Sequence, residues 1–186
     1  TAHIADIVAD LRVYARSDSD ERPTIVDVAD VVDQCVRLVG REVTRNGVIE
    51  RDFPDDLPPL VVPRSRLTQV VTNLLVNAAH AIREVERPIH RVRSRARADD
   101  RFVAISISDT GPGIASETLE RIFDPFFTTK PKELGSGLGL SISRAILRKL
   151  GGDLLVDSVV GEGANFVCLV PVPAQDVVRE AYLKSA

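Results

Sequence analysis

The sequence has no tryptophan and no methionine, and only two of its 186 residues are cysteines. Cys35 and Cys168 lie far apart, each inside an apolar stretch, so we expect two buried thiols rather than a disulfide or a metal site. No apolar run reaches the roughly 20 residues that span a membrane, and no signal peptide opens the chain. With a net charge of −3, the protein as a whole has no electrostatic reason to bind nucleic acid.

The sequence does have enough apolar content for a folded core. Hydrophobic residues make up 44% of the chain, and the mean hydropathy is close to zero, as in globular proteins. The length suits one domain of ordinary size with a short additional element. The chain begins at Thr1 rather than at a methionine, so we expect it to be a piece of a longer protein.

Apolar residues at helical spacing predict four long helices and a short one. The predicted helices cover residues 1–17, 31–47, 64–82, 116–122 and 140–150. Alternating or short apolar runs predict strands. The predicted strands cover residues 24–28, 48–53, 89–98, 102–108, 153–156 and 165–170. Residues 110–138 are rich in glycine and proline and hold only the short helix, which is typical of a functional loop such as a lid.

Three side-chain amides share one face of the predicted helix 64–82. Gln69, Asn73 and Asn77 follow each other at intervals of four residues, so they lie beside its apolar stripe. An amide oxygen is a hard, neutral ligand that suits Mg²⁺, an ion that keeps several waters and also takes phosphate oxygens. Taken alone, this row is more simply explained as the solvated face of an amphipathic helix.

Asp109 directly follows the predicted strand 102–108, and Gly111 and Gly113 come just after it. An ionised carboxylate only accepts hydrogen bonds, so it suits an exocyclic amine such as adenine N6 and is a poor neighbour for phosphate. The two glycines would let the backbone approach a flat ring closely. An ordinary turn at the end of a strand is the simpler explanation of this motif by itself.

Gly135, Gly137 and Gly139 lead directly into the predicted helix 140–150. Backbone N–H groups at the start of a helix, free of side chains, form an anion site. Two better-known phosphate loops do not fit: a dinucleotide fingerprint should follow a strand, and a P-loop needs Gly-Lys-Ser/Thr, which this chain does not contain. The alternative is a glycine-rich hinge.

Three phenylalanines occur within five residues of the loop, at Phe123, Phe126 and Phe127. Because aromatic rings are usually buried, we expect this segment to fold as a lid against another part of the protein. Lys130 follows closely and is placed to reach a terminal phosphate, although a solvated lysine explains it equally well. Together, the amides, the carboxylate and the bare backbone supply what Mg·ATP requires, and we predict that the chain binds ATP and Mg²⁺.

The order of these segments resembles that of a known family. Residues 73–78 resemble an N box, 109–113 a G1 box, 123–127 an F box and 135–139 a G2 box, and 161–166 resemble the family's glycine hairpin. Over residues 24–173 the chain is similar to the catalytic, ATP-binding (HATPase, GHKL) domain of bacterial two-component sensor histidine kinases, most like the nitrogen-regulation type. The resemblance implies an α/β (α+β) two-layer sandwich of the Bergerat type: a mixed, mostly antiparallel sheet with helices on one face, preceded by one helix.

The same resemblance implies roles for particular residues. Asn77 would bind Mg²⁺ and Asp109 would recognise adenine, and Asn73 and Lys130 are the candidates for a catalytic role. The implied nucleotide site consists of Asn73, Asn77, His80, Asp109, Gly111, Gly113, Ile114, Lys130, Gly135, Gly137, Leu138 and Gly139.

The resemblance also implies a domain arrangement and partners. Residues 1–22 would be the second helix of a dimerisation and phosphotransfer hairpin with its linker, 23–173 the ATP-binding domain, and 174–186 a tail. The histidine that accepts phosphate is absent, because His3, His80 and His90 lack the acidic neighbour of its motif. The implied partners are the protein's own dimerisation domain and a response regulator. We expect a homodimer for the full-length protein, no membrane contact for this part, and a cytoplasmic location, free or as part of a membrane-anchored sensor.

Several alternatives remain open from the sequence. Gyrase-type, mismatch-repair and heat-shock ATPases share the fold but carry glutamate at the position of Asn73, and asparagine cannot act as a general base. A serine kinase of the anti-sigma-factor type fits less well with the helix predicted for 1–17. A non-catalytic nucleotide-binding module is a third possibility.

The alternating arginines of the predicted strand 89–98 indicate a solvated strand face. The alternatives are that this face binds an acidic protein partner or nucleic acid. The arginines are Arg91, Arg93, Arg95 and Arg97.

Overall fold

The computed structural model describes residues 22–44, 47–86, 90–130, 136–178 and 181. The helix predicted for residues 1–17 lies outside the described residues, as does most of its linker. In the described part of the chain, no helix is long and apolar enough to cross a lipid bilayer.

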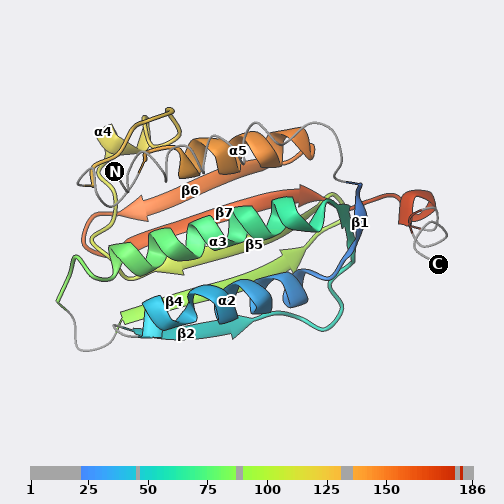
Figure 1. The fold of residues 1–186 in the computed structure, drawn as a ribbon, viewed down its shortest axis with the longest axis horizontal. Coiled ribbons are helices and arrows are strands. Elements are labelled where there is room, and N and C mark those ends of the chain that lie inside the picture. Colours follow the sequence, from blue (N-terminus) through green and yellow to red (C-terminus); the bar gives the residue numbers. More distant parts are fainter. Residues whose placement is uncertain (1–21, 45–46, 87–89, 131–135, 179–180, 182–186) are drawn as a thin grey trace, which may run out of the picture.

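A five-stranded sheet forms one layer of the protein (Figure 1). Its strand order is β2 (Gly47–Asp52), β4 (His90–Ala98), β5 (Phe102–Asp109), β7 (Gly163–Pro171) and β6 (Asp153–Val159). β2 runs parallel to β4, and every other pair is antiparallel. The predicted mixed, mostly antiparallel sheet is therefore confirmed.

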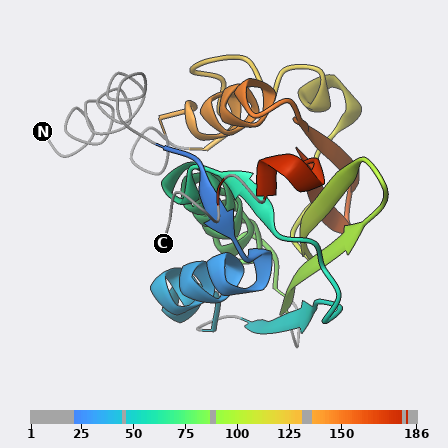
Figure 2. The ribbon, with the colours of Figure 1, turned by 90° about the vertical axis from the view of Figure 1, so that its right-hand side faces the viewer.

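Three helices form the second layer on one face of this sheet. They are α2 (Val28–Thr44), α3 (Arg64–Ala81) and α5 (Gly139–Lys149). Figure 2 shows the helices on one side and the strands on the other. The short helix α4 (Ser116–Leu119) lies in the long connection between β5 and α5. The predicted two-layer sandwich is confirmed.

The core lies between the two layers because each contributes one apolar face. The residues of the predicted α3 stripe are all buried: Leu67, Val70, Val71, Leu74, Leu75, Ala78 and Ile82. Alternate residues of β5 and β7 face them, including Ile105, Ile107 and Cys168. Each large side chain buried in this way stabilises the fold by roughly 1.5–3 kcal/mol. Both cysteines are buried and free, as predicted.

The start of α2 differs from the prediction. The strand predicted for 24–28 ends two residues earlier, as β1 (Thr24–Val26), and Val28 already belongs to α2. Asp27 explains the change, because its carboxylate accepts hydrogen bonds from the backbone N–H groups of Ala29 (2.7 Å) and Asp30 (3.3 Å). An aspartate that binds these N–H groups starts a helix.

Other predicted boundaries were also wrong, and one strand was missed. α2 ends at Thr44 rather than near residue 47, α4 ends at Leu119, and β6 and β7 extend towards each other into a tight hairpin. The missed strand is β3 (Leu60–Val62), which pairs antiparallel with β1 in a separate two-stranded sheet. Three residues next to prolines are too few to show alternation.

The open face of the sheet carries the arginine row, as predicted. Glu50 on β2 pairs with Arg91 and Arg93, and Asp52 pairs with Arg95 and Arg97. The parallel register of β2 and β4 brings these charges together. On the opposite face of β4, Val92 and Ala96 are buried, while Ala98 at the end of the strand is exposed. The arginines therefore belong to a solvent-facing ladder that is partly neutralised within the protein.

Asp153 at the start of β6 ties that strand to α5. Its carboxylate binds Arg144 at 2.9 Å and Arg148 at 3.2 Å, and the two guanidinium groups hold its pKa well below the usual range. We expect Asp153→Asn to lower the free energy of unfolding at neutral pH by about 1 kcal/mol. A depressed pKa stabilises the folded state only while the carboxylate is ionised. The difference between the two proteins should therefore persist above the ordinary aspartate pKa of 3.8 and disappear at lower pH.

Chemical denaturation of both proteins across a pH series measures this effect. Asp157→Asn, on the same strand but exposed, is the matched control and should change stability little at any pH. A deficit for Asp153→Asn that stays constant in acid would show that the charge of the carboxylate is not the cause.

Candidate nucleotide-binding site

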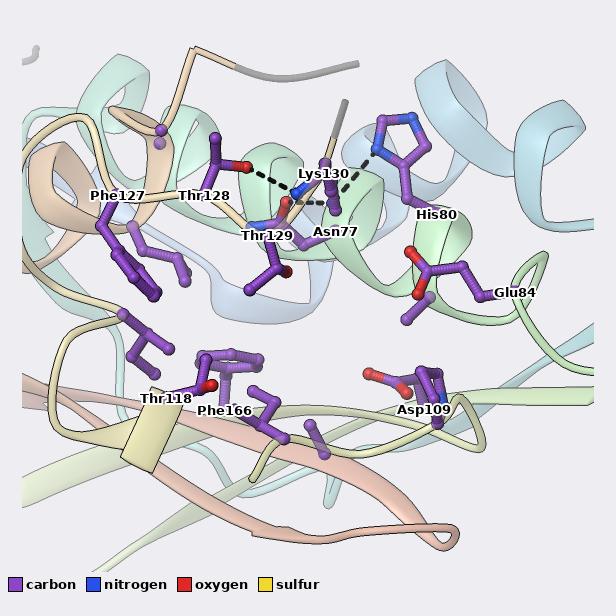
Figure 3. A pocket seen from close by; sticks show the side chains of 18 of the residues that line it. Asn77, His80, Glu84, Asp109, Thr118, Phe127, Thr128, Thr129, Lys130 and Phe166 are labelled. Atoms are coloured by element: carbon purple, nitrogen blue, oxygen red, sulfur yellow. Dashed lines mark hydrogen bonds between the residues drawn. The ribbon is translucent and has the colours of Figure 1, made fainter. Parts of the chain in front are cut away.

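A cavity of about 500 Å³ opens between α3 and the sheet. Its walls come from α3 on one side, from the ends of β5 and β7 on another, and from residues 112–130 and the start of α5 on the rest. Figure 3 shows side chains from these elements converging on one space. The wall combines apolar rings and methyl groups with a small number of charged and amide groups, as is typical of sites for small organic ligands.

Asp109 provides a buried acceptor at one end of the cavity. It is the last residue of β5, it is 9% exposed, and its carboxylate accepts a hydrogen bond from the backbone N–H of Gly111 at 2.8 Å. Burial raises its pKa, while the N–H groups of Gly111 and Ala164 and the charge of Lys130 act in the opposite direction. The chain can turn this tightly because residue 111 is glycine, where a Cβ would collide with Ala81. The geometry therefore holds a carboxylate against a ring-sized space.

Asn77, His80 and Lys130 form a polar group on the α3 side. The ammonium of Lys130 donates to the amide oxygen of Asn77 at 3.3 Å and lies 3.3 Å from His80 Nδ1 (Figure 3). Burial lowers the pKa of Lys130, and the charges of Glu84 and Asp109 raise it. Lys130 thus lies inside the cavity, and the alternative of a fully solvated lysine is wrong.

The start of α5 presents bare backbone to the same space. Leu138 at its N-cap makes no side-chain capping hydrogen bond, and Gly139 begins the helix. A Cβ at Gly139 would run into the amide of Asn73, whose Nδ2 donates to Ser143 at 3.0 Å. Gly137 has a φ of 71° and lies against the backbone of Phe126, so a side chain there would be strained and crowded. Uncapped N–H groups at a helix start favour an anion.

Most of the predicted site residues come together here. The predicted residues that line the cavity are Asn73, Asn77, His80, Asp109, Gly113, Ile114, Lys130, Gly137 and Gly139. Gly111 does not line the cavity, but its backbone N–H donates a hydrogen bond to the carboxylate of Asp109, which does. Leu138 is buried at the N-cap of α5 and does not line the cavity. Gly135 lies outside the described residues.

The phenylalanine segment meets the prediction only in part. Phe123 and Phe127 are partly buried against the core, and the guanidinium groups of Arg144 and Arg121 lie 4.4 and 4.5 Å from their ring centres. Phe126, by contrast, is 63% exposed and has a φ of 67°, so its expected burial was wrong. An exposed aromatic ring in a left-handed backbone conformation is costly, and such strain is concentrated at functional segments.

Several lining residues were not predicted. Glu84 follows α3 seven residues after Asn77, and that helical spacing could have revealed it. Thr118 of α4 and Phe166 of β7 carry no local signal, because only the tertiary fold brings them to the cavity. Among the described residues, no group of three or more His, Cys, Asp or Glu side chains could hold a metal ion by itself.

Comparison with known proteins identifies the family. The family described as "Histidine kinase-, DNA gyrase B-, and HSP90-like ATPase" matches residues 63–174. Sensor kinase CckA of Brucella abortus is 34% identical over 178 residues, which cover 90% of this chain and 19% of CckA. Sensor histidine kinase ZraS of Escherichia coli O157:H7 is 38% identical over 149 residues, which cover 79% of this chain and 31% of ZraS.

Solved structures agree with this relationship. Full-length ShkA in complex with AMPPNP matches 92% of this chain and 36% of its own length, with 29% identity and a TM-score of 0.75. The catalytic domain of histidine kinase ThkA matches 80% of this chain and 97% of its own length, with 28% identity and a TM-score of 0.69. The chain belongs to the histidine kinase-, gyrase B- and HSP90-like ATPase family, and sensor histidine kinases are among its relatives. It spans about a fifth to a third of the length of these curated relatives.

Proposed function

We propose that this chain is the ATP-binding catalytic domain of a sensor histidine kinase: it binds Mg·ATP and donates the γ-phosphate to a histidine on a dimerisation domain. The observation that supports this most strongly is the polarity of a single cavity. A buried carboxylate, Asp109, lies at one end, and bare helix N–H groups with the ammonium of Lys130 lie towards the other. Such a cavity suits a molecule with a hydrogen-bond donor at one end and anionic groups at the other.

ATP has this distribution of groups. Its adenine N6 amine can donate to Asp109, and its phosphates can accept from the start of α5 and from Lys130. The structural relative ShkA was solved in complex with the ATP analogue AMPPNP, which supports nucleotide binding by this fold.

The residues present also fit Mg²⁺. The amide oxygen of Asn77 already faces the cationic nitrogen of Lys130, so a positive charge is accommodated at that position. One neutral oxygen is a suitable contribution from the protein, because Mg²⁺ bound to nucleotides takes its other ligands from phosphate and water. A bound Mg²⁺ would supply charge neutralisation of the phosphates.

The proposed reaction transfers the phosphoryl group between two molecules. An imidazole nitrogen of the acceptor histidine forms a bond to the γ-phosphorus, the bond from that phosphorus to the bridging oxygen breaks, and ADP leaves with the electron pair. In this chain, the N–H groups of α5 and Lys130 would hold the phosphates in line with the incoming nitrogen. The acceptor's own domain and a response regulator are the partners, and a homodimer is the expected assembly.

Asn73 favours transfer over hydrolysis. Its amide donates to Ser143 and packs against Gly139, and an amide cannot take a proton from water at neutral pH. We therefore expect the chain to release phosphate from Mg·ATP at a rate close to that of a blank without protein. A coupled phosphate-release assay measures this, with the protein pre-incubated with apyrase to remove contaminating nucleotide and then purified again. Steady release well above the blank would instead support the ATPase class within the family.

Phosphotransfer itself tests the proposed function. The chain is mixed with γ-labelled ATP, Mg²⁺ and a separately made dimerisation hairpin that carries its histidine. We expect acid-labile, base-stable label on the hairpin, and none on a hairpin whose histidine is replaced by glutamine. Acid-stable label would indicate a serine kinase, and binding of ATP with no transfer to the cognate hairpin would indicate a nucleotide-binding module.

A further inference from the structure

Glu84 is an acidic side chain in a cavity that we propose for a polyanion. It follows the C-cap of α3 at Ile82, and its backbone N–H donates to the carbonyl of Ala81 at 3.1 Å, which fixes the turn. Figure 3 shows its carboxylate directed into the cavity, between His80 and Asp109. Within the described residues, no group donates a hydrogen bond to this carboxylate, so its acceptor capacity is available to a ligand.

The charges around it place Glu84 between the two ends of the site. The Glu84 charge raises the pKa of Lys130 at the phosphate end and that of Asp109 at the base end. In Figure 3 the Glu84 carboxylate lies between His80, which belongs to the polar group of α3, and Asp109 at the base end.

The chemistry of ATP limits what a carboxylate here can bind. A carboxylate accepts hydrogen bonds and repels phosphate, so it needs a donor. At neutral pH the strong donors of ATP are the N6 amine and the 2′ and 3′ hydroxyls of the ribose. The proposed function assigns the amine to Asp109, and the ribose connects the base to the phosphates. The ribose hydroxyls are therefore the donors that remain for Glu84, which lies between the base end and the phosphate end of the site.

We propose that Glu84 recognises the ribose by accepting hydrogen bonds from its hydroxyl groups, so that the site selects ribonucleotides over deoxyribonucleotides. This inference rests on the proposed function. Carboxylates take this role in other nucleotide sites, where an acidic side chain binds the ribose 2′-hydroxyl. Glu84 is exposed in the free protein. An analogue without the hydroxyl therefore loses the charge-assisted hydrogen bond to its carboxylate, which is worth about 1.5–3 kcal/mol.

Calorimetric titration with ATP, 2′-deoxy-ATP and 3′-deoxy-ATP, each with Mg²⁺, tests the inference. We expect the unmodified protein to bind at least one deoxy analogue about tenfold or more weakly than ATP. Glu84→Ala should weaken ATP binding by a similar factor and should bind all three nucleotides alike. Glu84→Gln keeps one acceptor oxygen and should retain part of the discrimination. Glu86→Ala is the matched control, because this glutamate is exposed like Glu84 and lies two residues further on, but does not line the cavity.

Two results would overturn the assignment while leaving the proposed function intact. In the first, the unmodified protein binds ATP and both deoxy analogues equally well. In the second, Glu84→Ala changes the affinity for all three nucleotides by the same factor, which would show that Glu84 acts only through its charge. Failure of the unmodified, folded protein to bind ATP at all would overturn both proposals together.

Discussion

Replacing Asp109 with asparagine is expected to weaken ATP binding about 10- to 100-fold. The carboxylate accepts a hydrogen bond from the backbone N–H of Gly111 and, in the proposed complex, another from adenine N6. An asparagine has one oxygen and one NH₂ group, so a donor must face a donor at one of these positions. Leaving a buried hydrogen-bonding group unpaired costs about 1–3 kcal/mol, which corresponds to this loss of affinity.

The same substitution should change the stability of the nucleotide-free protein little. Burial raises the pKa of Asp109, so the ionised carboxylate is costly in the folded state, and a neutral amide removes that cost while it weakens a backbone hydrogen bond. Titration calorimetry measures binding and thermal melting measures stability, with Asp157→Asn as the control on the open face of the sheet. Unchanged affinity for ATP in Asp109→Asn would contradict the assignment of this residue to the base.

Replacing Asn77 with alanine is expected to remove the dependence of ATP binding on Mg²⁺. The amide oxygen of Asn77 is the neutral ligand that we assign to the ion, and it faces the ammonium of Lys130 in this structure. We expect the affinity for Mg·ATP to fall about 100-fold or more, because loss of even an outer-shell partner of a metal costs roughly 10- to 100-fold. Affinity for ATP in excess EDTA should change much less, and phosphotransfer should be lost.

Gln69→Ala is the matched control for this experiment. Gln69 carries the same amide on the same helix, two turns earlier, where it accepts from Arg66 at 3.2 Å and lies outside the cavity. It should bind Mg·ATP like the unmodified protein. An equal loss of affinity with Mg²⁺ and with EDTA in Asn77→Ala would show that the amide contacts the nucleotide itself or shapes the cavity rather than binding the ion.

The sequence predicted those parts of the fold that repeat a pattern over many residues. The helix predicted for residues 64–82 has seven apolar positions on one face, six in α3 and one at its C-cap, and all seven are buried. β4 and β5 alternate over eight or nine residues, and their buried faces follow that alternation except at Ala98. β3 was missed because three residues hold no complete period.

The sequence predicted those residues of the candidate site whose type and immediate neighbours in the chain already indicate a role. Asp109 ends a strand and precedes glycines, and Gly139 opens a helix, so each could be assigned a role before the fold was known. Phe166 and Thr118 reach the cavity from β7 and α4, and nothing in their neighbourhoods shows it. The exposure of Phe126 could not be predicted from the sequence either. Aromatic rings are usually buried, and here the left-handed backbone conformation of Phe126 accompanies an exposed ring.

The central claim is that the groups around this cavity form one site for Mg·ATP, and titration calorimetry on the unmodified protein tests it most directly. The account predicts saturable binding of one nucleotide per chain, strengthened by Mg²⁺ and competed by ADP. A protein that melts cooperatively, and so is folded, yet gives no heat of binding at several temperatures and shows no shift in melting temperature with Mg·ATP would contradict it.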